Sequence, residues 1–330
     1  MSKENTQSVR PSWPPRPVVA TNGAVLYGDE LLNSADEVIE FCAQFRTTSK
    51  FSANLLGSSY YIFRGQSDAA WRLIPSAFRT DAFENFTPQP PYEYEDGKRG
   101  QCLASHLHAE ARSVFIFLEE ADRLGLQTPL DYTTTRDDDE YMKAAWESRE
   151  DFDFAKAFPS RSYERATALA QHNGVPTRFL DWSESPLVAC YFAAFAVSSV
   201  ALGPGAARWE GREIALYYMN HHQLNGPESR VRLVVVPRHE NPFLRAQQGV
   251  FTNQVNINQV FLETGSWPSL DDGSSGLQIY RVRMPASCAD DLLRRLYDLG
   301  ISRQSLMPSF EHAASAYAYT KALFDRSETA

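Results

Sequence analysis

The fold of this 330-residue chain is decided by a short stretch, Tyr61-Ile62-Phe63-Arg64-Gly65-Gln66. Aromatic and β-branched residues predict a strand over Tyr60–Arg64 that ends in an arginine. Apolar neighbours on the strand would bury the guanidinium, and a buried guanidinium needs a partner. Gly65 would let another backbone or a ligand approach closely. Gln66 adds an amide that both donates and accepts hydrogen bonds.

Two interpretations of Arg64 stay open at this level. The arginine is either a structural residue that pairs with an internal carboxylate such as Asp181, or it binds an anion. Its planar guanidinium matches phosphate geometry, which favours the second interpretation.

A second segment is dense in hydrogen-bonding side chains and lies between two helices that are predicted to be buried. It reads Gln171-His172-Asn173-Gly174-Val175-Pro176-Thr177-Arg178-Phe179-Leu180-Asp181-Trp182-Ser183. Such density costs free energy unless the groups satisfy each other or a ligand. Individually, His172 could face the dipole at a helix C-terminus, and Asp181 could pair with Arg178 or Arg64. Taken together, the residues predict that this segment and Arg64 converge on one cleft.

A third segment, Arg245-Ala246-Gln247-Gln248-Gly249-Val250-Phe251, repeats the pattern of an arginine, amides and a glycine before an apolar stretch. A simple turn entering a strand is the alternative interpretation.

The four cysteines are far apart in the sequence, and His106 and His108 project to different sides of a predicted helix. Neither set has the ligand spacing of a tetrahedral site, so we expect no metal.

Composition is that of an ordinary globular protein, with 43% hydrophobic and 22% charged residues. The net charge of -9 and the pI of about 5.4 argue against a general nucleic-acid binder, which needs a basic face. The sparse cysteines and the absence of an apolar N-terminal core favour a soluble, cytoplasmic protein.

The uncharged stretch Leu187–Leu202 approaches a membrane span in length, but its capped proline and its many alanines predict a helix buried in a soluble domain.

Residue patterns place helices early and strands late, without alternation of the two, and this arrangement favours an α+β fold. We expect a proline-rich N-terminal arm over residues 1–33 and one domain over 34–325, with a helical and loop insertion at about 81–160. The expected helices begin at the capping box of Ser34 and otherwise cover residues 102–126, 160–171, 187–202, 287–299 and 309–325. The later strands are expected at Glu213–Met219, Val231–Val236, Val250–Val255, Gln259–Glu263 and Leu277–Arg283.

These segments resemble the FRG domain family, which is named for the Phe-Arg-Gly that stands here at residues 63–65. The resemblance continues through Trp71, Pro75 and Phe78, and resumes over residues 171–182 and 189–193. Residues 248–251 and 300–308 also look like family segments.

A more distant similarity connects the strand-Arg-Gly pattern to the arginine-type mono-ADP-ribosyltransferases, in which the arginine holds the phosphates of NAD. Their second motif, a Ser-Thr-Ser before a helix, is similar to the stretch Asp181-Trp182-Ser183-Glu184-Ser185. Their Glu-x-Glu motif would fall at Gln247-Gln248-Gly249, where neither glutamate position holds a glutamate. A glutamine could hold the ribose but supplies no negative charge to the transition state.

The resemblance implies a split antiparallel sheet flanked by helices and a cleft that binds a nucleotide, with NAD as the candidate substrate. It implies ADP-ribosyl transfer or NAD hydrolysis by a bacterial toxin or defence effector, with a protein or nucleic acid as acceptor and no membrane involvement. The alternative is a non-enzymatic binding module whose polar motifs brace the core, and a nucleic-acid-directed effector is a third option. The implied catalytic residues are Arg64, Ser183, Gln247 and Gln248, and the implied NAD-binding residues are Arg64, Gly65, Gln66, His172, Thr177, Arg178, Asp181 and Trp182.

Overall fold

The computed structural model describes residues 17–51, 60–79, 86, 97–129, 163–202, 208–226, 228–238, 241–308 and 310–325. Residues 1–16 of the predicted arm, and most of the insertion predicted at 81–160, lie outside this part of the chain. Within it the protein is a mixed helix-and-sheet structure, in agreement with the predicted α+β class.

One seven-stranded sheet organises the described residues, with the strand order β3-β9-β6-β4-β5-β8-β7. Its strands are β3 (Gly28–Leu31), β4 (Tyr61–Gln66), β5 (Phe179–Ser183), β6 (Glu213–Asn220), β7 (Val231–Val234), β8 (Gly249–Gln254) and β9 (Tyr280–Pro285). The short strands β1 (Val18–Val19) and β2 (Val25–Leu26) pair separately. Because β3 runs parallel to β9, the sheet is mixed, and the expected antiparallel pairing holds for the other strand pairs but not at this edge. Part of the predicted arm thus belongs to the sheet.

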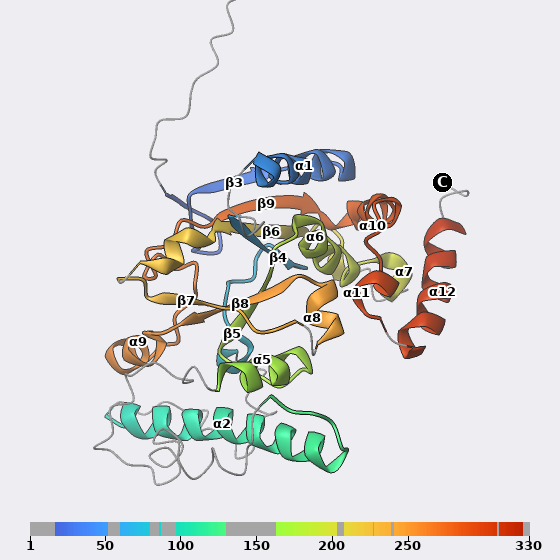
Figure 1. Cartoon of the computed structure of the whole chain (residues 1–330). Coiled ribbons are helices and arrows are strands. Elements are labelled where there is room, and N and C mark those ends of the chain that lie inside the picture. The colour runs from blue at the N-terminus through green and yellow to red at the C-terminus, as the bar shows by residue number, and fades with distance from the viewer. Residues whose placement is uncertain are drawn as a thin grey trace, which may run out of the picture.

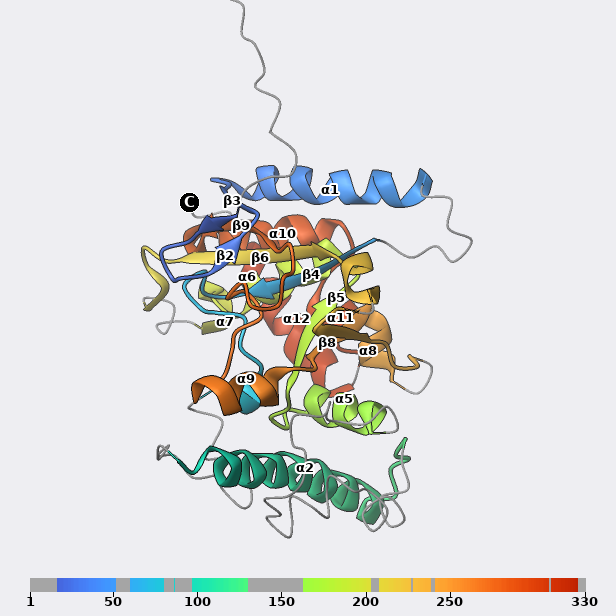
Figure 2. The same cartoon turned by 90° about the vertical axis from the view of Figure 1, so that its left-hand side faces the viewer.

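Helices surround the sheet in groups that are distinct in the two views (Figures 1 and 2). The α-helices are α1 (Ala35–Phe51), α2 (Arg99–Arg123), α5 (Glu164–His172), α6 (Pro186–Phe195), α7 (Ser199–Leu202), α8 (Pro242–Ala246), α9 (Ile257–Thr264), α10 (Ala289–Asp298), α11 (Arg303–Leu306) and α12 (Phe310–Asp325). The 3₁₀ turns are η1 (Ser76–Phe78), η4 (His221–Asn225) and η5 (Ala286–Cys288).

Strands β4 and β5 lie at the centre of the sheet and hold it together weakly. The structure describes a single register pair between them, Phe63 with Ser183, whereas β4 and β6 share six pairs. A single pair provides little of the hydrogen-bond ladder that joins neighbouring strands. The sheet therefore opens beside this pair, and Arg64, the next residue of β4, lies at the opening.

Helix α6 covers the sheet at β4 and explains the glycine after Arg64. A Cβ at Gly65 would lie 1.9 Å from the carbonyl oxygen of Ala189 in α6, well inside van der Waals contact. The predicted close approach at Gly65 is confirmed, and the approaching group is a backbone. Phe63 and Val188 belong to the core cluster that α1, α6 and α10 form with one face of the sheet, while Ile62 and Trp182 belong to a second core on the other face.

Helix α2 lies outside α5 in both views (Figures 1 and 2). Leu103 and Leu107 of α2 pack in one cluster with Ala166 of α5 and Phe261 of α9. This described part of the predicted insertion is therefore bound to the rest of the protein through an apolar core of its own.

Two predicted elements differ from the structure. Residues Gln259–Glu263, expected as a strand, lie inside helix α9. The reason is that the buried residues Ile257 and Phe261 are four apart, which places them on one helical face, and Gly265 ends the helix in a left-handed conformation with φ 74°. The single helix predicted over Leu187–Leu202 ends at Phe195, and the chain turns before α7.

Within the described residues, no helix combines the length and apolar character that crossing a membrane requires. Helix α6 has ten residues and begins, as predicted, at Pro186 behind the side chain of Ser185, which accepts a hydrogen bond from the backbone of Val188.

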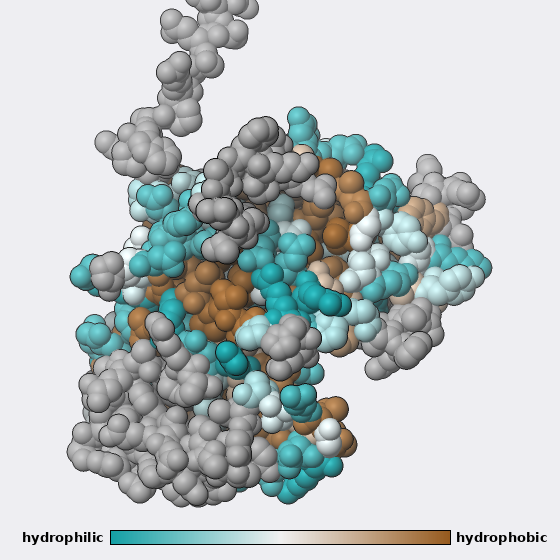
Figure 3. Space-filling model, in the orientation of Figure 1, coloured by the Kyte–Doolittle hydropathy of each residue, from teal (hydrophilic) through white to brown (hydrophobic). Residues whose placement is uncertain are grey.

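On the face seen in Figure 3, apolar residues gather in separate areas with polar residues between them. This view of the described surface therefore shows mixed polarity.

Candidate functional site

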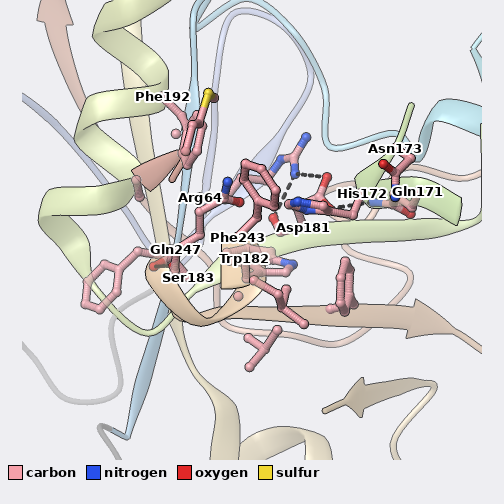
Figure 4. Close-up of a pocket in the computed structure, with 18 residues that line it drawn as sticks. Arg64, Gln171, His172, Asn173, Asp181, Trp182, Ser183, Phe192, Phe243 and Gln247 are labelled. Atoms are coloured by element: carbon pink, nitrogen blue, oxygen red, sulfur yellow. Dashed lines mark hydrogen bonds and ion pairs between the residues drawn. The ribbon is translucent and has the colours of Figure 1, made fainter. Parts of the chain in front are cut away.

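A pocket of about 560 Å³ lies where β4 and β5 separate. Strand β4 contributes Arg64 and Gly65, β5 contributes Asp181 and Ser183, and the end of α5 contributes His172 (Figure 4). The complete lining is Phe63, Arg64, Gly65, Gln171, His172, Asn173, Asp181, Trp182, Ser183, Ala189, Phe192, Phe243, Leu244, Gln247, Gly249, Val250, Phe251 and Met307. The predicted convergence of Arg64 with the segment 171–183 on one cleft is confirmed.

Arg64 occupies the opening between the two strands. Its Nη1 donates a hydrogen bond of 2.7 Å to the backbone carbonyl of Asp181 and lies 3.7 Å from Oδ2 of the same residue. The Nε atom is buried and has no hydrogen-bond partner in the described structure. Burial lowers the pKa of Arg64, and the Asp181 carboxylate opposes this shift. An arginine remains charged under such shifts, so the pocket holds a cation with donor capacity to spare.

Asp181 is the partner of Arg64 but is not enclosed by it. Its side chain is 60% exposed, whereas that of Arg64 is 13% exposed. Gln171 donates a 2.7 Å hydrogen bond from Nε2 to Oδ1 of Asp181, and Thr177 hydrogen-bonds the Oε1 of Gln171 (Figure 4 shows the Gln171–Asp181 bond). The carboxylate is thus oriented from one side and open on the other.

His172 stands at the end of α5, where its ring lies 5.7 Å from the ring of Phe243. Burial lowers the pKa of His172, and the nearby Asp181 carboxylate opposes that shift. The imidazole is therefore mostly neutral at pH 7, and it contributes a polar aromatic face rather than a charge.

Ser183 and Gln247 meet at the bottom of the opening. The Ser183 hydroxyl donates a 2.8 Å hydrogen bond to the backbone carbonyl of Gln247 and accepts one of 3.0 Å from the backbone of Ser185. The amide of Gln247 reaches the carbonyl of Leu306 at 3.4 Å. These contacts tie β5, the turn before β8 and helix α11 together at the pocket, because the hydroxyl and the amide each bridge two segments.

Four of the sequence-predicted site residues do not line the pocket. Gln66 is buried and donates to the carbonyl of Trp71, which anchors the loop after β4. Thr177 is buried and orients Gln171 from behind. Gln248 adopts a positive φ of 49° and turns the chain into β8, where its carbonyl accepts a hydrogen bond from the backbone of Glu184.

Arg178 is the fourth, and it is engaged elsewhere. Its Nη2 donates to Oε2 of Glu110 at 2.7 Å, its Nε lies 3.0 Å from Oε1, and its Nη1 donates to Asn258 at 3.1 Å. Both side chains of the ion pair are 1% exposed. This arginine therefore joins α2, α9 and the start of β5 in the core.

Sequence reasoning missed the apolar wall of the pocket and the partner of Arg178. Phe243 and Leu244 come from α8, whose start carried a readable signal in the Asn241 cap and Pro242, and Met307 follows α11. Phe192 of α6 lies at the opposite end of the site from Gln171 (Figure 4). Glu110 lies in the predicted insertion, and no local pattern marks it as a partner for an arginine 68 positions away.

The described residues hold no cluster of histidine, cysteine, aspartate or glutamate that could bind a metal ion. Cys42 of α1 and Cys190 of α6 approach to 3.7 Å between their sulfur atoms, and both are buried in the core that the two helices share. Hydrogen bonding with Cys42 and burial raise the pKa of Cys190, which keeps it a thiol.

Comparison with known protein families identifies one domain. The FRG domain matches residues 59–201, a range that contains Arg64, the segment 171–183 and helix α6. Residues 248–251 and 300–308, which also looked like family segments, lie outside the match. No curated protein and no solved structure matches the chain.

Proposed function

We propose that this chain, whose residues 59–201 carry an FRG domain, binds a nucleotide in the pocket between β4 and β5, with NAD as the ligand. Arg64 would bind the diphosphate. The observation that carries the proposal is the guanidinium at the opening of the sheet, which has a buried Nε with no partner in the described structure and an open pocket beside it. A planar fork with unused donors suits an anion with several oxygens.

The shape and chemistry of the pocket support a ligand of this class. Its volume of about 560 Å³ falls in the range of small-molecule and cofactor sites. Phe192 and Phe243 provide apolar surface for flat rings, while Ser183 and Gln247 provide hydroxyl and amide groups that suit a ribose. An arginine in a central strand, beside the opening of the sheet, also supports the resemblance to ADP-ribosyltransferases.

Under this proposal the reaction is ADP-ribosyl transfer to a protein or nucleic acid, or NAD hydrolysis, in a bacterial toxin or defence effector. Arg64 and Ser183 would bind and orient the nucleotide, and Gln247 would hold the ribose. Gln248 would set the turn that places Gln247, because its own side chain is exposed and outside the lining.

The alternative function is a non-enzymatic binding module, and one observation favours it. Gln247, the residue at the first glutamate position, reaches the pocket but carries no charge. Incubation of the protein with NAD separates the two functions. An enzyme releases nicotinamide with turnover, whereas a binding module shows a calorimetric signal and returns the nucleotide unchanged.

The test of the binding proposal is a calorimetric titration of NAD and ADP-ribose into the wild type, Arg64→Lys and Arg295→Lys. Arg64→Lys should weaken binding by about 1.5–3 kcal/mol, because an ammonium cannot reproduce two directed charge-assisted hydrogen bonds. Arg295 is exposed on α10 and outside the pocket lining, so its replacement should leave the affinity unchanged. The proposal fails if the wild type binds neither nucleotide at millimolar concentration, or if Arg64→Lys binds as tightly as wild type.

A further inference from the structure

The charged side chains of the pocket restrict the kind of ligand that it can bind. Among the described residues that line it, the side chains with a formal charge are those of Arg64 and Asp181. His172 is mostly neutral at pH 7, because burial lowers its pKa. The lining therefore offers one cation and one anion. A purely anionic ligand would be attracted by Arg64 and repelled by Asp181, which lies 3.7 Å from it.

Asp181 differs from a carboxylate that only neutralises an arginine. In the core of this same protein, Glu110 performs that structural role and is 1% exposed, with both oxygens bonded to Arg178. Asp181 is 60% exposed, and the closest contact of Arg64 is to its backbone carbonyl rather than to its carboxylate. The carboxylate therefore retains accepting capacity that faces the pocket.

The orientation of Asp181 is nevertheless fixed. Its backbone pairs with Phe251 in the β5–β8 ladder, and Gln171 holds Oδ1. Gln171 is itself held by Thr177, which is fully buried. A carboxylate held in place before the ligand arrives loses little conformational freedom on binding. Its attraction for a charge on the ligand is therefore offset by only a small entropy cost.

We infer that Asp181 binds the positively charged part of the ligand, so that the pocket selects a molecule that carries both an anion and a cation. The inference rests on the proposed function and specifies it: the oxidised nicotinamide ring, a cation, would face Asp181 while the diphosphate faces Arg64. The reduced ring has no charge and would lose this attraction. Gln247 cannot replace Asp181 in this role, because an amide carries no charge.

The experiment is a calorimetric titration of NAD⁺, NADH and ADP-ribose into the wild type, Asp181→Asn and Asp298→Asn. The wild type should bind NAD⁺ about threefold or more tightly than NADH, which is the size of effect expected for one partly exposed charge pair. Asp181→Asn should remove this preference. It also relieves repulsion of the diphosphate, a change that all three nucleotides share, so the ratio of the NAD⁺ and NADH affinities isolates the contribution of the ring. Asp298 is exposed at the end of α10, outside the pocket lining, and its variant should keep the wild-type ratio.

Equal affinities of the wild type for NAD⁺ and NADH, or a wild-type ratio in Asp181→Asn, would overturn the inference and leave nucleotide binding intact. If the wild type binds none of the three ligands, the proposed function fails and the inference fails with it. Should thermal melts show that Asp181→Asn is unfolded, Gln171→Leu provides the second variant. It keeps the carboxylate and removes its orienting hydrogen bond, so the ratio should fall toward one, and an unchanged ratio would count against the inference.

Discussion

Arg64 and Arg178 both lie in the range that matches the FRG domain, and the structure gives them different surroundings. Arg178 makes four hydrogen bonds within 3.1 Å to the side chains of Glu110 and Asn258, all inside the core. Arg64 lies at the opening of the sheet, where its Nη1 contacts the exposed Asp181 and its Nε has no partner in the described structure. The burial of the partner, rather than that of the arginine, therefore separates a structural contact from a binding group.

Replacing each arginine in turn should give the largest difference in stability between the two sites. Arg178→Met should lower the free energy of unfolding by about 3–5 kcal/mol, because it strands the Glu110 carboxylate in the core. Arg64→Met should cost distinctly less, because the Asp181 carboxylate is already 60% exposed and stays solvated without its partner. Chemical denaturation of the two variants beside the wild type measures the difference.

A double variant, Arg178→Met with Glu110→Leu, is the control for this prediction. It should recover a large part of the lost stability, since an apolar pair of similar size removes the stranded charge. Equal destabilisation by Arg64→Met and Arg178→Met would contradict the distinction between the two sites.

The glycine beside Arg64 lets β4 pack closely against α6. Gly65→Ala should lower stability by about 1–3 kcal/mol or more, since the added methyl overlaps the backbone carbonyl of Ala189. Gly100→Ala in α2 is the matched control. A Cβ there has nothing within 4 Å, so the same change should be neutral or should stabilise the helix by up to about 1 kcal/mol. Thermal or urea unfolding that places both variants together would show that α6 can move away from β4.

The environment of Arg178 also predicts a pH dependence. His106 on α2 packs against Phe78 and Trp267, and burial followed by the nearby charge of Arg178 lowers its pKa to about 3. The unfolded chain takes up this proton near pH 6.5 and the folded chain does not, so the unfolded state binds more protons between these values. Stability should therefore fall as the pH drops from about 6.5, by up to about 1.4 kcal/mol per pH unit from this group.

Denaturation midpoints at pH 7 and pH 5 measure this slope. His106→Phe should flatten it, because an aromatic ring remains between Phe78 and Trp267 without a titrating group. His222→Asn, at an exposed position on η4, should leave the slope as it is in the wild type. A slope in His106→Phe equal to that of the wild type would show that other groups cause the acid sensitivity.

Local patterns in the sequence determined much of the framework. The aromatic and β-branched run before Arg64 predicts β4, the Ser185 cap and Pro186 predict the start of α6, and the density of polar groups in 171–183 predicts that they meet Arg64. These predictions succeed because each depends on neighbours in the chain or on the cost of burying polar groups. The strand expected at Gln259–Glu263 is wrong for the same reason. The helical spacing joins Ile257 to Phe261, and Ile257 lies outside the five residues from which the strand was predicted.

Only the tertiary structure decided which polar residues pair in the core and which line the pocket. Both arginines follow from the motifs, but the core partner of Arg178 comes from α2, 68 residues earlier in the chain. The single pair between β4 and β5, which opens the pocket, depends on how two strands separated by more than a hundred residues diverge. Sequence spacing carries no record of such distances, because they result from the packing of whole elements. The chain alone therefore determined the inventory of charged groups, and the packed fold decided that Arg178 is enclosed while Arg64 and Asp181 face an open pocket.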